Sequence, residues 1–211
     1  ACFNYETAHL YGNALASQFH LRHRVFIERQ AYNVPSHKGM EYDQFDNPAA
    51  QYFVWRDDQG IARGVARLAP TSVNYMLEEV WPHMVQDIAM PKSDRIWEGT
   101  RFGVDRDLDP KQRNIIVKEL VCAYIEYAIL NGIDDIIGVM PVGILRAVFA
   151  RNGWKSEAIG PEWREDGIDL VAAKLPCSLE VLYTVRRRTQ ASNVLQILGT
   201  DHLHDQGLEA A

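Results

Sequence analysis

Charged side chains occur inside segments that are otherwise typical of buried β-strands. Arg67 lies in the second of two adjacent strand-like segments, and Glu98, Thr100 and Arg101 lie in a later one. Charged groups are rarely fully buried unless they are paired, so we expect these side chains to pair with one another or with a bound ligand. The alternative is a solvent-exposed cross-strand pair, which is the more common arrangement of a glutamate and an arginine in strands.

A further acidic group lies between residues 29 and 50, where helical and strand periodicity are both missing. Glu41, Asp43 and Asp46 stand there among aromatic residues. A connection of this length in a compact domain is usually functional or mobile, and we predict a mobile loop at residues 29–50. Taken alone, an acidic run of this kind would more often be a solvated loop.

Several motifs of well-known nucleotide-binding and catalytic sites are absent from the sequence. It contains no GxGxxG after a strand, no GxxxxGK[ST], no HExxH and no GxSxG. Their absence argues against dinucleotide or nucleotide-triphosphate binding and against zinc-protease or serine-hydrolase activity. Residues 201–205 read Asp-His-Leu-His-Asp and suggest metal ligands, but they lie in the predicted tail, where we expect solvated chain. We therefore expect no metal site.

The elements that position these residues follow from hydrophobic periodicity and from the glycine and proline positions. Helices are predicted at residues 9–28, 75–85, 110–131, 143–152 and 178–198, and strands at residues 51–56, 61–68, 95–104, 135–140, 154–159 and 169–175. The helix 110–131 begins at Pro110, ends before Gly132 and is apolar around most of its circumference, so it should be buried against a sheet. The element order predicts one α/β domain over residues 1–198, with a mixed sheet between helices on both faces. A flexible tail is predicted at residues 199–211.

Composition limits the class of protein further. The 211 residues include 22 basic and 28 acidic side chains, for a net charge of −6, which is unsuited to broad nucleic-acid binding. Cys2, Cys122 and Cys177 are far apart and form no zinc spacing, as is typical of a reducing compartment. No apolar run approaches the ~20 residues of a spanning helix, and the N-terminus lacks a signal-peptide pattern. We therefore expect a soluble, cytoplasmic protein without nucleic-acid or membrane partners.

Several short blocks, in their content and order, resemble the acyl-homoserine-lactone synthase family, the autoinducer synthases of bacterial quorum sensing. The blocks are LRHRVF at 21–26, EYDQFD at 41–46, GVARLAPT at 64–71, YML at 75–77, VWP at 80–82, WEGTRF at 97–102 and RNGW at 151–154. The family's characteristic positions correspond to Arg22, Phe26, Asp43, Asp46, Arg67, Glu98 and Arg101. The chain departs from the family at Tyr32, where tryptophan is usual, and at Trp81, where phenylalanine is usual. Both are aromatic exchanges that affect the shape of the pocket.

The resemblance implies a single-domain three-layer α/β/α sandwich similar to the N-acetyltransferase (GNAT-like) fold. It also implies that an acyl group passes from a thioester, on acyl carrier protein or coenzyme A, to the amine of S-adenosylmethionine. The methionine carboxylate then closes a lactone ring and expels methylthioadenosine. S-adenosylmethionine is a substrate in this scheme, and no cofactor is implied.

The same resemblance suggests a role for each charged residue. Glu98 is the candidate general base for the amine proton, and Asp43, Asp46 and Arg101 complete the catalytic group. Substrate binding is assigned to arginines, which bind carboxylates through paired hydrogen bonds, and to neighbouring polar and aromatic residues: Arg22, Phe26, Tyr32, Arg67 and Thr100. Asp43 and Asp46 should order the loop 29–50 over the substrate. Backbone N–H groups of a splayed strand near residues 100–104 are candidates for stabilising the oxyanion.

An apolar slot for the acyl chain is expected around the strand 135–140 and the helix that follows it. Its candidates are Trp97, Phe102, Ile137, Val139, Met140, Val142, Leu145 and Phe149. In the family, a hydroxyl residue at the position of Val139 tends to accompany 3-oxo chains, so Val139 favours an unsubstituted acyl group. Acyl carrier protein is acidic and should dock on basic residues. The candidates are Arg146, Arg151 and Lys155, with Arg186, Arg187 and Arg188 as further positions.

Two other functions fit part of the sequence. A GNAT-type N-acetyltransferase would bind the pyrophosphate of coenzyme A with a glycine-containing loop at a helix N-terminus. Residues 105–110, which occupy that place here, read Asp-Arg-Asp-Leu-Asp-Pro and contain no glycine. A noncatalytic module would bind S-adenosylmethionine or a lactone without releasing methylthioadenosine.

Overall fold

The structure is a computed structural model that describes residues 1–30 and 34–198. Its main sheet has the strand order β1-β4-β5-β6-β7-β10-β8, with β9 paired to β10. The strands of this sheet are β1 Cys2–Phe3, β4 Gln51–Arg56, β5 Ala62–Pro70, β6 Ile96–Val104, β7 Asp135–Pro141, β8 Glu157–Ala158, β9 Trp163–Glu165 and β10 Ile168–Pro176. A separate hairpin is formed by β2 Ser36–His37 and β3 Met40–Glu41.

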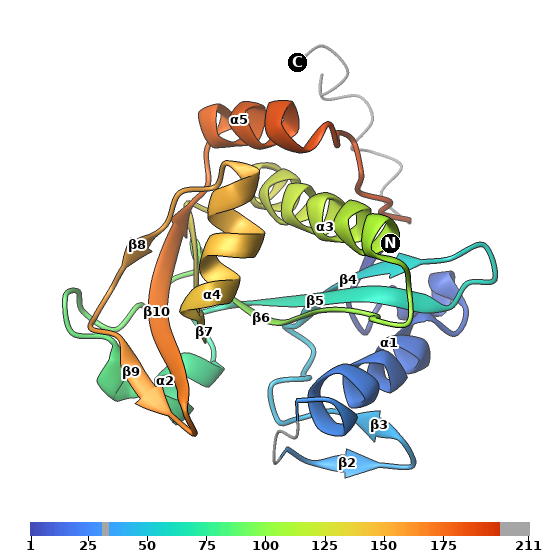
Figure 1. The fold of residues 1–211 in the computed structure, drawn as a ribbon, viewed down its shortest axis with the longest axis horizontal. Helices are drawn as coiled ribbons and strands as arrows, with labels where there is room; N and C mark the ends of the chain where they lie inside the picture. Colours follow the sequence, from blue (N-terminus) through green and yellow to red (C-terminus); the bar gives the residue numbers. More distant parts are fainter. Residues whose placement is uncertain (31–33, 199–211) are drawn as a thin grey trace.

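Helices cover both faces of the main sheet (Figure 1). The helical segments are α1 Ala14–Arg22, α2 Met76–Val80, α3 Pro110–Leu130, α4 Val142–Ile144 and α5 Leu179–Thr189, together with the short or π-helical segments η1 Ala8–Tyr11, η2 His23–Glu28, η3 Pro82–Met84, η4 Leu145–Phe149 and η5 Ala150–Asn152. α1 and α2 lie on one face, whereas α3 and α4 lie on the other, with α5 stacked on α3 (Figure 1). The predicted three-layer α/β/α sandwich with a mixed sheet is therefore confirmed.

The sheet divides into two halves that separate at one end. β6 and β7 are parallel and pair only where Ile96–Glu98 meets Asp135–Ile137. Beyond this point β6 continues along β5, and β7 continues along β10. Since the two central strands then have different partners, they diverge, and the two halves of the sheet separate at this end. The site described below lies on β6 where the strands diverge.

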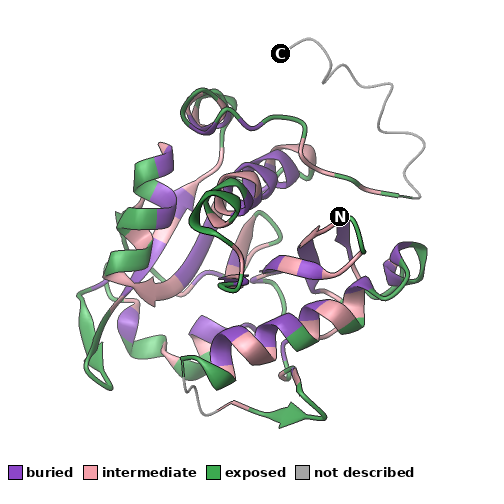
Figure 2. Cartoon of the chain, turned by 45° about the vertical axis from the view of Figure 1, so that its right-hand side comes forward, coloured by how far each residue is buried: buried purple, intermediate pink, exposed green. Residues whose placement is uncertain are grey.

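The central helix α3 combines strong local signals with extensive burial. Its N-cap residue Asp109 accepts hydrogen bonds from the backbone N–H groups of Lys111 and Gln112, and Pro110 occupies the first turn. Gly132 follows the helix with a φ of +65°, which glycine adopts without strain. The second half of the helix, from Leu120 to Ala128, is buried (Figure 2), because its apolar residues pack against the sheet on one side and α5 on the other.

Several predicted element boundaries differ from the structure. The predicted helix 9–28 is split into η1, α1 and the π-helical η2, and the predicted strand 154–159 is reduced to β8. The loop 29–50 contains the β2–β3 hairpin, and β1 and β9 were not predicted. The predicted helix 178–198 is wrong beyond Thr189, because Gln190 adopts a left-handed φ of +59° and ends α5. The predicted tail 199–211, with its His-containing segment, lies outside the described residues, as does Tyr32.

Gln18 of α1 is fully buried, and neither Nε2 nor Oε1 of its side chain has a hydrogen-bond partner among the described residues. A buried polar group without a partner costs about 1–3 kcal/mol. Gln18→Met keeps the length of the side chain and removes both polar atoms, so we expect the free energy of unfolding to rise by about 1–2 kcal/mol. Urea denaturation measures this change. An equal loss of stability would instead indicate that Gln18 binds an internal water molecule.

Candidate active site

Three side chains form a row across the sheet, one from each of three neighbouring strands. Tyr52 of β4 stands opposite Arg67 of β5, and Arg67 stands opposite Thr100 of β6. Opposite residues of antiparallel strands point to the same face of the sheet. Arg67 Nε donates to Thr100 Oγ1 at 2.9 Å, and the Arg67 side chain is only 1% exposed. The alternative of a solvent-exposed cross-strand pair is therefore excluded.

A β-bulge in β6 determines where Arg101 points. The register of β5 and β6 shifts by one residue here, which leaves Arg101 and Phe102 together opposite Ala66. Arg101 has a φ of +53°, a conformation that is uncommon for residues other than glycine. Strict alternation would place Arg101 on the opposite face from Thr100, and the bulge redirects it to the same face. Phe102 points the other way, toward α3, with its ring 6.0 Å from that of Tyr124.

The acidic segment of residues 41–46, which starts at the last residue of β3, folds over this row. Phe45 is buried and anchors the segment. The segment also forms a turn, because the Asp46 backbone N–H donates to the Asp43 carbonyl oxygen and the Asp43 backbone N–H donates to Asp46 Oδ2 at 2.8 Å. The carboxylates of Glu41, Asp43 and Asp46 are at most 5% exposed. The reading of this segment as a solvated acidic loop is therefore wrong.

Three arginines from α1, β5 and β6 bind these carboxylates. Arg22 donates to Glu41 Oε2 at 2.5 Å and, through two nitrogens, to both oxygens of Asp46 at 2.7 and 2.8 Å. Arg67 binds Asp43 at 2.7 and 3.1 Å and also lies 2.8 Å from Asp46 Oδ1. Arg101 binds Asp43 Oδ2 at 2.7 Å and Glu41 Oε1 at 3.0 Å. We call these six side chains the arginine–carboxylate cluster.

The cluster balances its own charge, since three guanidinium groups face three carboxylates. Burial alone would raise the pKa of Asp46, but the hydrogen bonds from Arg22 and the charge of Arg67 outweigh it and hold that pKa well below its ordinary value. Asp46 is therefore ionised, and each of the three carboxylates is paired with guanidinium groups. Asp43 and Asp46 thus face arginines in this structure, and their expected role in ordering the segment over the substrate stays a prediction.

Glu98 differs from the cluster in both its partners and its pKa. It is 3% exposed, and its two oxygens accept hydrogen bonds from the backbone N–H groups of Met76 at 2.9 Å and Leu77 at 2.6 Å, at the start of α2. Burial raises the pKa of Glu98 to about 7, although the two backbone bonds oppose that shift. No ion pair joins Glu98 to an arginine in the described part of the chain, so of the two expected arrangements, pairing with an arginine or with a ligand, pairing with a ligand remains a prediction.

Aromatic and sulfur-containing side chains border the cluster. The Arg101 guanidinium lies 5.7 Å from the ring centre of Phe26, and Arg101 Nη1 lies 3.6 Å from Met76 Sδ. A Cβ atom on Gly103 would lie 3.2 Å from the Phe26 ring, so this glycine allows η2 to approach β6 closely. The predicted site residues Arg22, Phe26, Asp43, Asp46, Arg67, Thr100 and Arg101 are thus brought together.

Three residues of this region were not predicted as site residues. Glu41 was noted as part of the acidic run, and its position two residues before Asp43 was a signal that could have identified it. Tyr52 carried no such signal, and Met76 stood only within the family-like block at residues 75–77. Tyr52 was a strand residue, and Met76 belonged to a predicted helix, so that their contacts with the cluster depend on the fold.

The predicted acyl slot is divided between the two faces of the sheet. Phe149 belongs to the buried apolar cluster beneath α3, and four partly buried residues pack against that cluster: Trp97, Phe102, Met140 and Leu145. Ile137 and Val139 belong to a separate cluster with Tyr75 and Leu77 on the other face. Alternate residues of a strand point to opposite faces, which is why Val139 and Met140 of β7 are separated. Val142, at the start of α4, is half-buried.

The predicted docking residues Arg146, Arg151 and Lys155 are all exposed, on and after η4 and η5. Arg187 and Arg188 of α5 are also exposed, and the Arg188 side chain passes close to Gly153. Arg186 does not belong to this surface, because it binds the buried carboxylate of Glu126 at 3.0 Å. We define the basic surface as the five exposed residues Arg146, Arg151, Lys155, Arg187 and Arg188.

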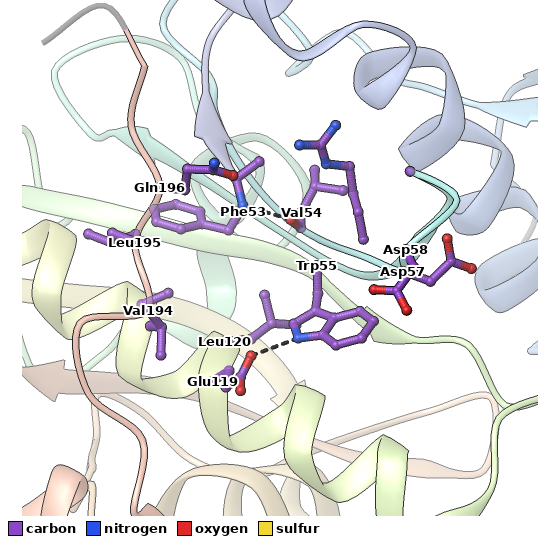
Figure 3. Close-up of a pocket in the computed structure, with 14 residues that line it drawn as sticks. Phe53, Val54, Trp55, Asp57, Asp58, Glu119, Leu120, Val194, Leu195 and Gln196 are labelled. Atoms are coloured by element: carbon purple, nitrogen blue, oxygen red, sulfur yellow. Dashed lines mark hydrogen bonds between the residues drawn. The ribbon is translucent and has the colours of Figure 1, made fainter.

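A cavity of about 440 Å³ lies away from the cluster, between β4, α3 and residues 194–196 (Figure 3). Trp55 of β4 lines it and donates from Nε1 to Glu119 Oε2 of α3 at 2.7 Å. No residue of the arginine–carboxylate cluster lines this cavity, so its size does not mark it as the reaction site. Among the described residues, no group of three or more His, Cys, Asp or Glu side chains is arranged to hold a metal ion.

Known proteins match both the sequence and the fold. The autoinducer synthase family profile matches residues 6–185. An acyl-homoserine-lactone synthase from Aeromonas salmonicida is 31% identical over 160 residues, which are 74% of each chain. The structure of TofI, in a ternary complex with an inhibitor and MTA, is 31% identical with a TM-score of 0.73 and covers 87% of this chain and 95% of its own. BjaI, a CoA-dependent acyl-homoserine lactone synthase with SAM and isopentyl-CoA, reaches a TM-score of 0.84 at 24% identity and covers 92% and 90%.

The fold also resembles that of a putative N-acetyltransferase from Lactobacillus plantarum, with a TM-score of 0.55 at 15% identity over 84% of this chain and 98% of that one. The splayed sheet and these neighbours define an acyltransferase of GNAT-like architecture. Within that class, the chain belongs to the autoinducer synthase family. The acyltransferase class and the family expected from the sequence are thereby confirmed. No helix of the described residues is long and apolar enough to span a membrane.

Proposed function

We propose that the protein transfers an acyl group from a thioester to the amine of S-adenosylmethionine and then forms an acyl-homoserine lactone with release of methylthioadenosine. The observation that carries this proposal is the contrast between the neutral arginine–carboxylate cluster and Glu98, whose pKa is near 7. S-adenosylmethionine has a sulfonium, an ammonium and a carboxylate, and so a net charge of about +1. Ionised Glu98 provides the single negative charge that balances it.

Glu98 is the general base in this proposal. The amine of S-adenosylmethionine must lose a proton before or during its attack on the thioester carbonyl. A base works best when its pKa lies close to the operating pH, and burial of Glu98 places its pKa there. The carboxylates of Asp43 and Asp46 act indirectly, because Asp46 is held by Arg22 and Arg67, and Asp43 by Arg67 and Arg101. They position Arg101, whose 12% exposed side chain is the most exposed of the three arginines.

The tetrahedral intermediate develops negative charge on the former carbonyl oxygen. Backbone N–H groups near the bulge at Arg101 are the candidates for stabilising that charge, because a bulge takes residues out of the regular hydrogen-bond ladder. The thioester would approach where β6 and β7 cease to pair, after Glu98 and Ile137. Its acyl chain would then pack beneath α3, against Phe102 and Phe149.

The start of α3 favours acyl carrier protein over coenzyme A as the donor. Free N–H groups at a helix N-terminus bind pyrophosphate, but here Asp109 accepts from Lys111 and Gln112. Asp105 adds a buried carboxylate next to this helix end, bonded by Arg24 and Arg63 at 3.0 Å each. A pyrophosphate would therefore meet carboxylates. The same feature disfavours the alternative of a GNAT-type N-acetyltransferase.

The basic surface is proposed to dock the acidic carrier protein. Arg151→Glu reverses one charge on this surface, and we expect the KM for an acyl-carrier substrate to rise about 10-fold while the KM for S-adenosylmethionine is unchanged. High salt should weaken the wild-type interaction in the same way. Steady-state kinetics measure both effects. Arg164→Glu, at an exposed site on β9, is the matched control, and an equal effect of both variants would contradict the docking surface.

The proposed reaction is tested by incubation with S-adenosylmethionine and a panel of acyl carrier protein and coenzyme A thioesters. Mass spectrometry should detect methylthioadenosine and an acylated lactone, and we expect unsubstituted acyl groups because Val139 has no hydroxyl. A simple N-acyl product would support an N-acyltransferase instead, and binding without methylthioadenosine would support a noncatalytic module. Mainly 3-oxo products would contradict the role of Val139. Since these substrates are cytoplasmic metabolites, we place the reaction in the cytoplasm.

A further inference from the structure

Tyr52 makes a hydrogen bond to the cluster that no catalytic role yet explains. Its hydroxyl donates to Asp46 Oδ1 at 2.9 Å, and its side chain is fully buried. Burial raises the pKa of Tyr52, and the neighbouring Asp46 carboxylate adds to this effect. The hydroxyl is therefore protonated at any working pH and acts as a donor.

The Asp46 carboxylate receives five hydrogen bonds or ion contacts, and they come from four parts of the chain. Oδ1 accepts from Arg22 at 2.7 Å, from Tyr52 at 2.9 Å and lies 2.8 Å from Arg67 Nη1. Oδ2 accepts from Arg22 at 2.8 Å and from the Asp43 backbone N–H at 2.8 Å. Tyr52 is the neutral side chain among these donors. Because its hydroxyl adds no charge, we expect it to affect the orientation of the Asp46 carboxylate and not the charge balance of the cluster.

The Tyr52 ring is itself held from several sides. Ring centres of Phe3, Tyr5 and Phe19 lie 5.8, 5.9 and 6.2 Å from it. Tyr5 also donates from its hydroxyl to the Asp46 carbonyl oxygen at 3.2 Å. The N-terminal segment thus supports Asp46 at both its backbone and, through Tyr52, its side chain. A donor on a fixed ring is well suited to hold a carboxylate in one rotation.

We propose that the Tyr52 hydroxyl is a positioning group that fixes the rotation of the Asp46 carboxylate and so sets the arginines that face S-adenosylmethionine. The path from Tyr52 is short. Asp46 contacts Arg67, Arg67 binds Asp43, and Asp43 binds Arg101. If Asp46 rotates, Arg67 and Asp43 must adjust, and Arg101 shifts at the most exposed end of the cluster. This inference rests on the proposed function.

Tyr52→Phe tests it, because this change removes the hydroxyl and keeps the ring contacts. We expect the KM and the dissociation constant for S-adenosylmethionine to rise about 10-fold, the lower end for a hydrogen bond to a charged group, while kcat changes less than about 3-fold. Tyr11→Phe is the matched control. Tyr11 is also buried; its hydroxyl donates to the Gln196 carbonyl oxygen at 2.9 Å and accepts from the Leu198 backbone N–H, and neither partner belongs to the cluster. Thermal unfolding should show similar losses of stability in the two variants.

The outcomes separate this inference from the proposed function. A rise in KM and dissociation constant for Tyr52→Phe alone supports the positioning role. Equal constants in Tyr52→Phe, Tyr11→Phe and the wild type would overturn it, even if the wild type releases methylthioadenosine. If the wild type binds S-adenosylmethionine but forms no product, the proposed function fails, and calorimetric binding still decides the role of Tyr52. If the wild type does not bind S-adenosylmethionine, both fail.

Discussion

Glu98→Gln should lower the turnover number by about 10²–10⁴-fold, the range expected when a general base is removed. Glutamine keeps the size of the side chain but cannot accept a proton at neutral pH. The KM for S-adenosylmethionine should change much less, because the arginine–carboxylate cluster remains intact. Steady-state release of methylthioadenosine measures both constants. Glu79→Gln on the exposed side of α2 is the control, and it should retain wild-type turnover.

The pH dependence of Glu98 provides a second readout of the same prediction. Because burial raises the pKa of Glu98 to about 7, kcat/KM of the wild type should increase with pH up to about 7 as the carboxylate ionises. This rise should be missing in Glu98→Gln. A wild-type pH profile that is flat between pH 6 and pH 8, together with wild-type turnover in Glu98→Gln, would show that Glu98 is not the base.

Stability should show the opposite trend with pH. The ordinary pKa of a glutamate is 4.5, and the folded value for Glu98 is higher, so the folded protein holds this proton more tightly than the unfolded chain. The contribution of Glu98 to the free energy of unfolding therefore falls as the pH rises from about 4.5 to about 7. This component should disappear in Glu98→Gln. Burial of Glu98 thus lowers the stability of the folded protein near neutral pH, and the same burial gives Glu98 a pKa suited to accepting a proton.

Asp46→Asn should have the largest effect on stability. It removes the charge of a buried carboxylate and leaves Arg22 and Arg67 with excess positive charge, and breaking a buried pair in this way costs about 3–5 kcal/mol. Catalysis should fall at least about 100-fold, since a displacement of about 1 Å in a substrate-binding group has that effect. Urea denaturation and the methylthioadenosine assay measure the two losses.

Asp87→Asn is the control for Asp46→Asn, because Asp87 is exposed and lies outside the cluster. It should change stability by less than about 0.5 kcal/mol. The pH dependence of the stability that Asp46 contributes also follows from its pKa. The pKa of Asp46 lies below its ordinary value of 3.8, so its stabilising contribution is complete above about pH 4 and is lost only as the pH falls further. A stable, active Asp46→Asn enzyme would contradict a structural role for the cluster.

Local sequence signals were sufficient for much of the scaffold. Strand periodicity placed β4 at residues 51–56, where the structure has it. The helix α3 was equally clear, because Pro110 at its first turn and Gly132 after its end are signals that act within a few residues. The amino-acid types also identified Arg67, Glu98 and Arg101 as unusual, since a charge in a strand requires a partner whatever the fold.

The partners themselves were decided by the tertiary structure. α1, the segment after β3, β5 and β6 are far apart in sequence, and their charged side chains meet only when the sheet has formed. The direction of Arg101 depends on a bulge that shifts alternation by one residue, and no pattern of residue types encodes that shift. Glu98 likewise binds backbone N–H groups of α2, and a backbone group leaves no trace in side-chain identity.

The position at which α5 ends was also decided by a contact with a distant part of the chain. Residues after Thr189 continue a plausible helical pattern, but the buried Glu126 carboxylate of α3 accepts hydrogen bonds from the backbone N–H groups of Asn193 and Val194 at 2.7 and 3.0 Å. These bonds replace the ones that a longer helix would provide. Residue types therefore determined which groups needed partners and where regular elements form. Long-range contacts determined which partners they found, because burial and charge pairing are properties of the folded chain.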